Sequence, residues 1–350
     1  MFYLSSFIPI IIIGLFIMGI ARFFRGRRRG SHFLQGFFSK EDVISQIYFL
    51  IFIFFLGVLL LALNRQFGDP LPHTSIILIT SLIGLGLAYY FKLFLTLMVS
   101  LIGVVTWWSA EAAIIADKKD IKAIAVFSGV LFITFLFYLI SRFYETKKEF
   151  KRASLVYMVL GVLPVTITLF VFSMKDGLRA LSELTEGGPV FSSWEITLSL
   201  TLFLLVLLGA FVYVISKKLI FPLEAVAIGV FTLLFLVLIF LPEQVVSASK
   251  RYWQMELTGI GVLWAAIFNL LTFLELVGFI FLGYAKRKNW LINAGVFLLF
   301  VFVFIKYFDW FFTFLDKSIF FIIAGILLFV VGWTMERGRR YMISAIKKES

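Results

Sequence analysis

The sequence predicts an all-α fold, a polytopic bundle of about eleven transmembrane helices, and three observations support this prediction. Of the 350 residues, 62% are hydrophobic and only 15% are charged, whereas soluble domains are close to half apolar and a quarter charged. Apolar runs of about 20 residues, the length that crosses a bilayer core, recur along the whole chain. The Lys and Arg residues gather in short clusters between these runs.

The apolar runs predict spanning helices, in chain order, over 3–24, 46–64, 74–90, 93–116, 121–141, 153–174, 196–216, 219–241, 257–285, 289–308 and 317–335. Only Phe91 and Lys92 join the third and fourth runs. A single helix there would reach about 65 Å, twice the thickness of a bilayer core, so a turn is expected.

The connections between these helices are short. The segment 175–195 contains the turn-forming run Glu186-Gly187-Gly188-Pro189 and is expected to be an irregular exposed loop. No connection is long enough for a soluble domain, so residues 1–350 are expected to form a single integral membrane domain.

Small residues at helical spacing predict close helix packing in two of the spans. Thr80, Gly84 and Ala88 share one face of the span 74–90, and Gly325 and Gly332 share a face of the last span. These faces indicate packing rather than a functional site.

The distribution of basic residues predicts the orientation of the bundle. With the N-terminus outside and eleven spans, 22 of the 32 Lys and Arg residues lie on the cytoplasmic side. We therefore expect a cytoplasmic C-terminus, a multi-pass location in the cell (inner) membrane and contacts with anionic lipid headgroups. The residues expected at that surface are Arg25, Arg27, Arg28, Arg29, Arg337, Arg339 and Arg340. The apolar run of the first span has no basic residues ahead of it, which favours a retained helix over a cleavable signal peptide.

Composition and motifs exclude several classes of function. The net charge is +12, but the basic residues that produce it lie in short clusters between apolar runs, so nucleic acid is not an expected partner. The chain has no cysteine, and its two histidines, His32 and His73, fall outside the predicted helix interiors. No metalloprotease, nucleotide-binding or intramembrane protease motif is present. No catalytic residue, metal or cofactor is expected, and enzymatic activity is not the favoured interpretation.

Glu275 is the strongest candidate for a functional side chain, because it lies near the middle of the predicted helix 257–285. A carboxylate there costs about 2.5–3.5 kcal/mol on insertion, which the surrounding apolar residues offset. Thr272 precedes it by one turn and Asn269 lies on the same segment, so these three residues form a candidate intramembrane polar site. The carboxyl group either ties helices together by hydrogen bonding or binds a proton or cation.

A second candidate cluster lies where the last two spans approach the outer face. Lys306 and Asp309 are one turn apart and able to pair, and Asp316 is placed to cap the last helix. This cluster is either an outer-face ion-recognition site or an interfacial ion pair beside a helix cap.

The C-terminal hairpin, residues 286–350, resembles the signature of a prokaryotic membrane-protein family known as domain of unknown function 2157. The resemblance is carried by Asn293, Gly295, Tyr307, Phe308, Asp309, Leu315, Ser318, Phe321, Gly325, Gly332, Glu336, Arg337, Arg339 and Arg340. Lys306 stands where that family usually has arginine, which keeps the charge but loses a bidentate donor. The resemblance implies a membrane location and no particular activity.

Three functions follow as hypotheses. The first is a transporter-like protein for a small solute or ion that uses Glu275 in a polar path between helices. The second is a non-catalytic structural or partner-binding subunit of a membrane assembly. The third, a lipid-modifying enzyme with its site near Asp309, has the least support because no nucleophile–base set is present.

Overall fold

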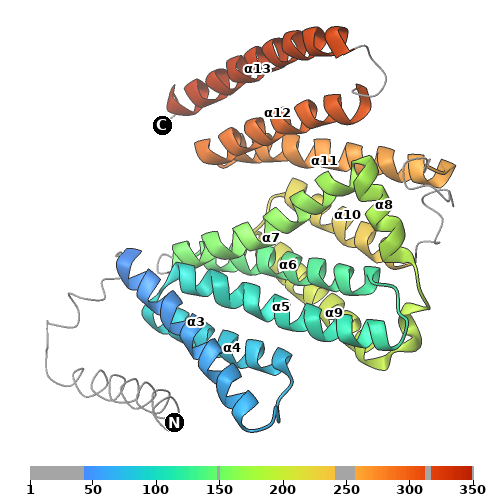
Figure 1. The fold of residues 1–350 in the computed structure, drawn as a ribbon. Helices are drawn as coiled ribbons and strands as arrows, with labels where there is room; N and C mark the ends of the chain where they lie inside the picture. Colours follow the sequence, from blue (N-terminus) through green and yellow to red (C-terminus); the bar gives the residue numbers. More distant parts are fainter. Residues whose placement is uncertain (1–42, 148–149, 241–256, 312–316, 349–350) are drawn as a thin grey trace, which may run out of the picture. The chain divides into compact units, whose positions relative to one another are not determined.

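The computed structural model describes residues 43–147, 150–240, 257–311 and 317–348, and these residues are almost entirely helical. The only β-type pairing among them is one isolated bridge between Ile121 and Gly188. The helices are α3 (Val43–Gln66), α4 (His73–Phe91), α5 (Phe94–Lys118), α6 (Ile124–Glu145), α7 (Lys151–Phe172), α8 (Lys175–Thr185), α9 (Trp194–Ser216), α10 (Pro222–Ile239), α11 (Gly259–Ala285), α12 (Asn289–Phe311) and α13 (Lys317–Lys348), with a 3₁₀ turn η2 (Val190–Ser192) before α9 (Figure 1).

Ten helices in the described part of the chain are long and apolar enough to cross a bilayer. They coincide one for one with ten predicted spans, so these predictions are confirmed, and the chain is a multi-pass membrane protein. The last helix is longer than predicted, because α13 continues past residue 335 to Lys348. The first predicted helix, 3–24, and the four arginines that follow it lie outside the described residues.

The described residues divide into two compact units. The first comprises the helices up to Ile114 together with Tyr144–Tyr157, and the second comprises Ile115–Phe143 and the residues from Met158 onward. The boundaries fall inside α5, α6 and α7, so no linker separates the units. The single membrane domain expected from the sequence stays a prediction.

In the first unit, the turn expected after Phe91 is present and the small residues pack as predicted. Lys92 adopts a left-handed conformation with φ of 58°, and this ends α4 and reverses the chain into α5. Gly84 of α4 lies against the Ser100 hydroxyl, and Gly103 of α5 lies against the Ser81 hydroxyl. A side chain at either glycine would collide with its neighbour, so the two helices approach closely through small residues.

In the second unit, α6 supplies much of the core. Phe135 of α6 contacts the rings of Phe231 and Phe235 on α10, with ring centroids 6.4 and 5.9 Å apart. On another side of α6, Gly161 of α7 lies against the backbone of Tyr138, so closely that an added Cβ would stand 2.6 Å from the Tyr138 nitrogen. Helices α6, α7 and α10 thus form a tightly packed frame.

The expectation of an irregular loop over 175–195 is wrong for its first half. Residues 175–185 form the helix α8, whose Leu178 and Leu181 are buried while Asp176 and Glu183 face outward. The apolar residues recur at helical spacing, but the segment is short and polar overall, so hydropathy alone did not reveal it. The predicted turn follows α8: the Gly188 amide donates a 2.7 Å hydrogen bond to the Asp120 carbonyl.

The last three helices pack in chain order, with α11 against α12 and α12 against α13. Gly283 of α11 lies against the backbone of Ile292, and Gly295 of α12 lies against the backbone of Ile280, so α11 and α12 form a close hairpin. Helix α13 packs beside α12 through Tyr307 and Ala324 (Figure 1).

Candidate functional site

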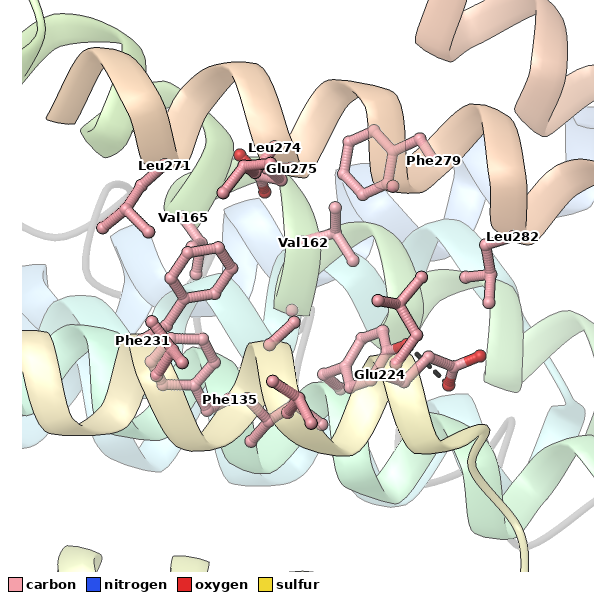
Figure 2. Close-up of a pocket in the computed structure, with 18 residues that line it drawn as sticks. Phe135, Val162, Val165, Glu224, Phe231, Leu271, Leu274, Glu275, Phe279 and Leu282 are labelled. Atoms are coloured by element: carbon pink, nitrogen blue, oxygen red, sulfur yellow. Dashed lines mark hydrogen bonds between the residues drawn. The ribbon is translucent and has the colours of Figure 1, made fainter. Parts of the chain in front are cut away.

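A cavity of about 270 Å³ lies in the second unit between α6, α7, α10 and α11 (Figure 2). Its walls are mostly apolar, but two carboxylates, Glu224 of α10 and Glu275 of α11, also line it. Small cavities with apolar walls and few polar groups are typical of ligand sites. The two carboxylates have very different surroundings.

Within the described residues, the Glu275 carboxyl group has one side-chain hydrogen-bond partner, Thr166. The Thr166 hydroxyl of α7 lies 2.8 Å from Oε1 of Glu275, and it lies 3.2 Å from the Val162 carbonyl of its own helix. The second carboxyl oxygen, Oε2, is buried and has no hydrogen-bond partner in the described part of the protein. A hydroxyl has only one proton to donate, so Thr166 does not satisfy the carboxyl group by itself.

The segment of α7 that faces Glu275 contains Pro164. Proline has no amide hydrogen, so the carbonyl of Leu160, four residues earlier, loses its normal helical partner. Thr166 follows two residues later, so the helix is weakened where it contacts the Glu275 carboxyl group.

Glu224 is instead held by two cations and a phenol. Its Oε2 lies 3.2 Å from Nε of Arg142, and its Oε1 lies 2.5 Å from Nζ of Lys286. The Tyr138 hydroxyl donates to Oε2 over 3.0 Å, as the dashed line in Figure 2 shows, and accepts a 2.6 Å bond from Nη2 of Arg142. The Arg142 and Glu224 side chains are only 3% and 4% exposed. This group of four side chains, the Glu224 cluster, is thus a buried, densely bonded network.

The three charged members of the Glu224 cluster lie at helix ends. Glu224 is the third residue of α10, which begins at Pro222, where a helix dipole favours an acidic side chain. Arg142 lies in the last turn of α6, and Lys286 follows the last residue of α11. The cluster therefore ties three helices together at one end of the unit.

Sequence reasoning did not find the Glu224 cluster. The signal was available, because the predicted spans put the end of 121–141, the start of 219–241 and the end of 257–285 on one side of the membrane. A lone acid at a helix start beside two basic helix ends favours an ion pair.

The structure does not bring Asn269 and Thr272 together with Glu275. The Thr272 hydroxyl donates to the Phe268 carbonyl of its own helix over 2.7 Å and is fully buried. Asn269 donates to the Ala265 carbonyl and, over 3.1 Å, to the Ser173 carbonyl just after the end of α7. Of the three, only Glu275 lines the cavity.

In the second candidate cluster, Lys306 connects α12 to the end of α7. Nζ of Lys306 lies 3.8 Å from Asp309, as predicted, and it also donates to the Ser173 carbonyl that accepts from Asn269. Two donors from α11 and α12 therefore meet at the end of α7, where carbonyls without a partner in the helix attract positive charge. Asp316 lies outside the described residues.

Part of the predicted basic surface forms a compact polar group on α13. Arg339 makes two hydrogen bonds to Glu336, of 2.6 and 2.7 Å, and a third of 2.9 Å to Asn293 of α12. Arg340 also bonds Glu336, and the Arg337 guanidinium lies over the Trp333 ring. Arg25, Arg27, Arg28 and Arg29 lie outside the described residues.

No family model matches the chain, and no curated protein or solved structure matches it significantly. Membership in the family that the C-terminal hairpin resembles stays a prediction.

Proposed function

We propose that this protein is a transporter-like protein for a small solute or ion, and that Glu275 is the carboxyl group that binds the solute or a coupled cation. The observation that carries the proposal is the state of Glu275: it lines a cavity, it has one hydroxyl donor, and its second oxygen has no partner among the described residues.

The comparison with Glu224 supports this role. A carboxylate in the hydrocarbon region is costly and normally persists by pairing. Glu224 has two cations and a phenol as partners, which suits a structural group. Among the described side chains Glu275 has Thr166 alone as a partner, so an ionised carboxylate there needs a further partner from the cavity, either a proton or a cation. Exchange of that partner is the elementary step of a coupled transporter.

The Glu224 cluster supplies a candidate gate for the same cavity. It joins α6, α10 and α11 at one end, and two of its members, Tyr138 and Glu224, line the cavity. Transporters open by separating helices that are packed together in another state. The positive-inside pattern supports placing this end at the cytoplasmic face of the cell membrane, where anionic headgroups meet the basic connections.

The test is solute flux into proteoliposomes that contain the purified full chain, measured across a panel of ions and small amines. Glu275→Gln is expected to lower flux at least tenfold. Glu111→Gln is the matched control, because Glu111 is a carboxylate of another helix, α5, and does not line the cavity. Flux of Glu275→Gln equal to the parent's would end the proposed role of Glu275.

The alternative function, a structural or partner-binding subunit, predicts a different pattern. The chain would move none of the solutes and would co-purify stably with other membrane proteins from its native membrane. That outcome would replace the transporter proposal.

A further inference from the structure

We infer that the cavity takes an amphipathic organic cation, a small ammonium compound whose apolar body lies against the cavity walls and whose charge meets the Glu275 carboxylate. The inference rests on the proposed function, because it treats the cavity as the solute site, and it adds the chemical class of the solute.

The walls favour an apolar body. Beside Glu275, the cavity is lined by Leu271 and Leu274 of α11, Val165 of α7 and Phe231 of α10 (Figure 2). Moving apolar surface out of water into an apolar environment is favourable, so a hydrocarbon chain or ring gains from these walls. A hydrated inorganic ion gains nothing from them and loses its water.

The polar groups favour a positive charge. Glu275 lines the cavity and its buried Oε2 lacks a hydrogen-bond partner among the described residues, whereas the other acidic side chain in the lining, Glu224, already binds Arg142 and Lys286. The rings of Phe135, Phe231 and Phe279 also line the cavity, and aromatic faces attract ammonium groups. An anionic body would be repelled by Glu275 and would gain no charge partner from the apolar walls.

Metal ions fit the site poorly. Calcium takes 6–8 oxygen ligands and magnesium about six, whereas Glu275 and Thr166 present one carboxyl and one hydroxyl group. Within the described residues, no three acidic or histidine side chains come close enough to hold a metal ion. An organic ammonium needs only one carboxylate, because its remaining surface is apolar.

The size of the cavity limits the ligand. At about 270 Å³ it falls just below the usual range of drug-binding pockets, which begins at about 300 Å³. The expected ligand is therefore about as large as a molecule with one aromatic ring and a short alkyl chain.

The experiment compares three probes with one shared body: 4-phenylbutylammonium, 4-phenylbutanol and 4-phenylbutanoate. Equilibrium binding to the full chain in nanodiscs is measured and corrected for partitioning into empty nanodiscs. The parent is expected to bind the ammonium at least tenfold more tightly than the alcohol, and the carboxylate most weakly. Glu275→Gln is expected to bind ammonium and alcohol with affinities within about threefold of each other, because a neutral amide keeps the shape and removes the charge.

A second variant tests the cavity without altering its charge. A Cβ at Gly278, which lines the cavity, would meet no atom within 4 Å, so Gly278→Leu is expected to fold and to fill the space. It should weaken the binding of the ammonium and the alcohol at least tenfold. Gly209→Leu is the matched control, because Gly209 of α9 is equally open but lies outside the cavity.

The outcomes separate this inference from the proposed function. Equal binding of ammonium and alcohol by the parent, or an ammonium preference that survives Glu275→Gln, overturns the inference even if Glu275-dependent flux of another solute is found. Charge-selective binding without any flux supports the cation site and overturns transport.

Discussion

The Thr166 hydroxyl of α7 and the Glu275 carboxyl group of α11 lie 2.8 Å apart, and this contact joins two helices that are far apart in the sequence. It differs from an ordinary buried hydrogen bond, because Oε2 of Glu275 remains without a partner in the described residues. The pair combines a contact between helices with a buried acceptor that lacks a partner among the described residues.

Thr166→Val removes the one side-chain donor to Glu275 found in the described part of the chain, while keeping the shape of the side chain. We expect the free energy of unfolding to fall by about 1–3 kcal/mol, because a buried polar group then loses its partner. Unfolding in mixed detergent–SDS micelles measures the change. Thr201→Val is the control, because Thr201 is exposed on α9 and bonds only its own helix, and its effect should stay within about 0.5 kcal/mol. Equal effects of the two changes would show that Thr166 contributes nothing beyond local helix bonding.

Glu224→Gln leaves Arg142 and Lys286 without their carboxylate partner. We expect a loss of about 3–5 kcal/mol, because breaking a buried ion pair leaves an uncompensated charge. The combined replacement Arg142→Met, Glu224→Leu and Lys286→Met removes all three charges and should recover most of that loss in the same unfolding measurement. A single change that costs less than about 1 kcal/mol would contradict the buried network described for this cluster.

Gly161→Ala places a methyl group against the backbone of Tyr138. We expect a loss of about 1–3 kcal/mol, because the backbone of α6 has to move to accept it. Gly209→Ala on α9 meets open space and should instead gain up to about 1 kcal/mol from helix propensity. Unfolding measurements are therefore expected to give changes in stability of opposite sign for the two variants. A gain in stability for Gly161→Ala would show that α6 and α7 are not in close contact.

Asn269 and Lys306 donate to the same Ser173 carbonyl, so their contributions to stability should be coupled. We expect a double-mutant cycle with Asn269→Leu and Lys306→Met to show a coupling energy of about 0.5–3 kcal/mol. The remaining donor still satisfies the carbonyl after either single change. Strictly additive effects would mean that the two side chains do not share this acceptor in the membrane.

The absence of cysteine allows single-cysteine labelling to test the orientation. Ser31→Cys and Ser344→Cys are expected to react with an impermeant maleimide only from the cytoplasmic side, because positive charge accumulates there. Ser192→Cys, on the opposite side in the predicted topology, should react from outside. Labelling of positions 31 and 344 from opposite sides would overturn the predicted number of spans.

The ten described spans could be predicted because hydropathy is a local property. Each needs only a run of apolar residues of sufficient length, and this can be read without knowing any neighbour. The turn at Lys92 followed from length in the same way. Helix α8 was missed because it is short and polar overall, and its buried residues Leu178 and Leu181 become apparent only against the helices they contact.

Hydropathy and the placement of charged residues are enough to predict that the chain lies in a membrane, the order of its spans and the position of one carboxylate, Glu275, near the middle of a span. Which polar groups meet depends on how the helices pack against one another. Glu275 contacts Thr166 rather than Thr272, and Glu224 meets Arg142 and Lys286. The physical reason is that membrane helices are apolar on every side, so their sequences specify where they cross the bilayer but not which face each helix turns toward its neighbours.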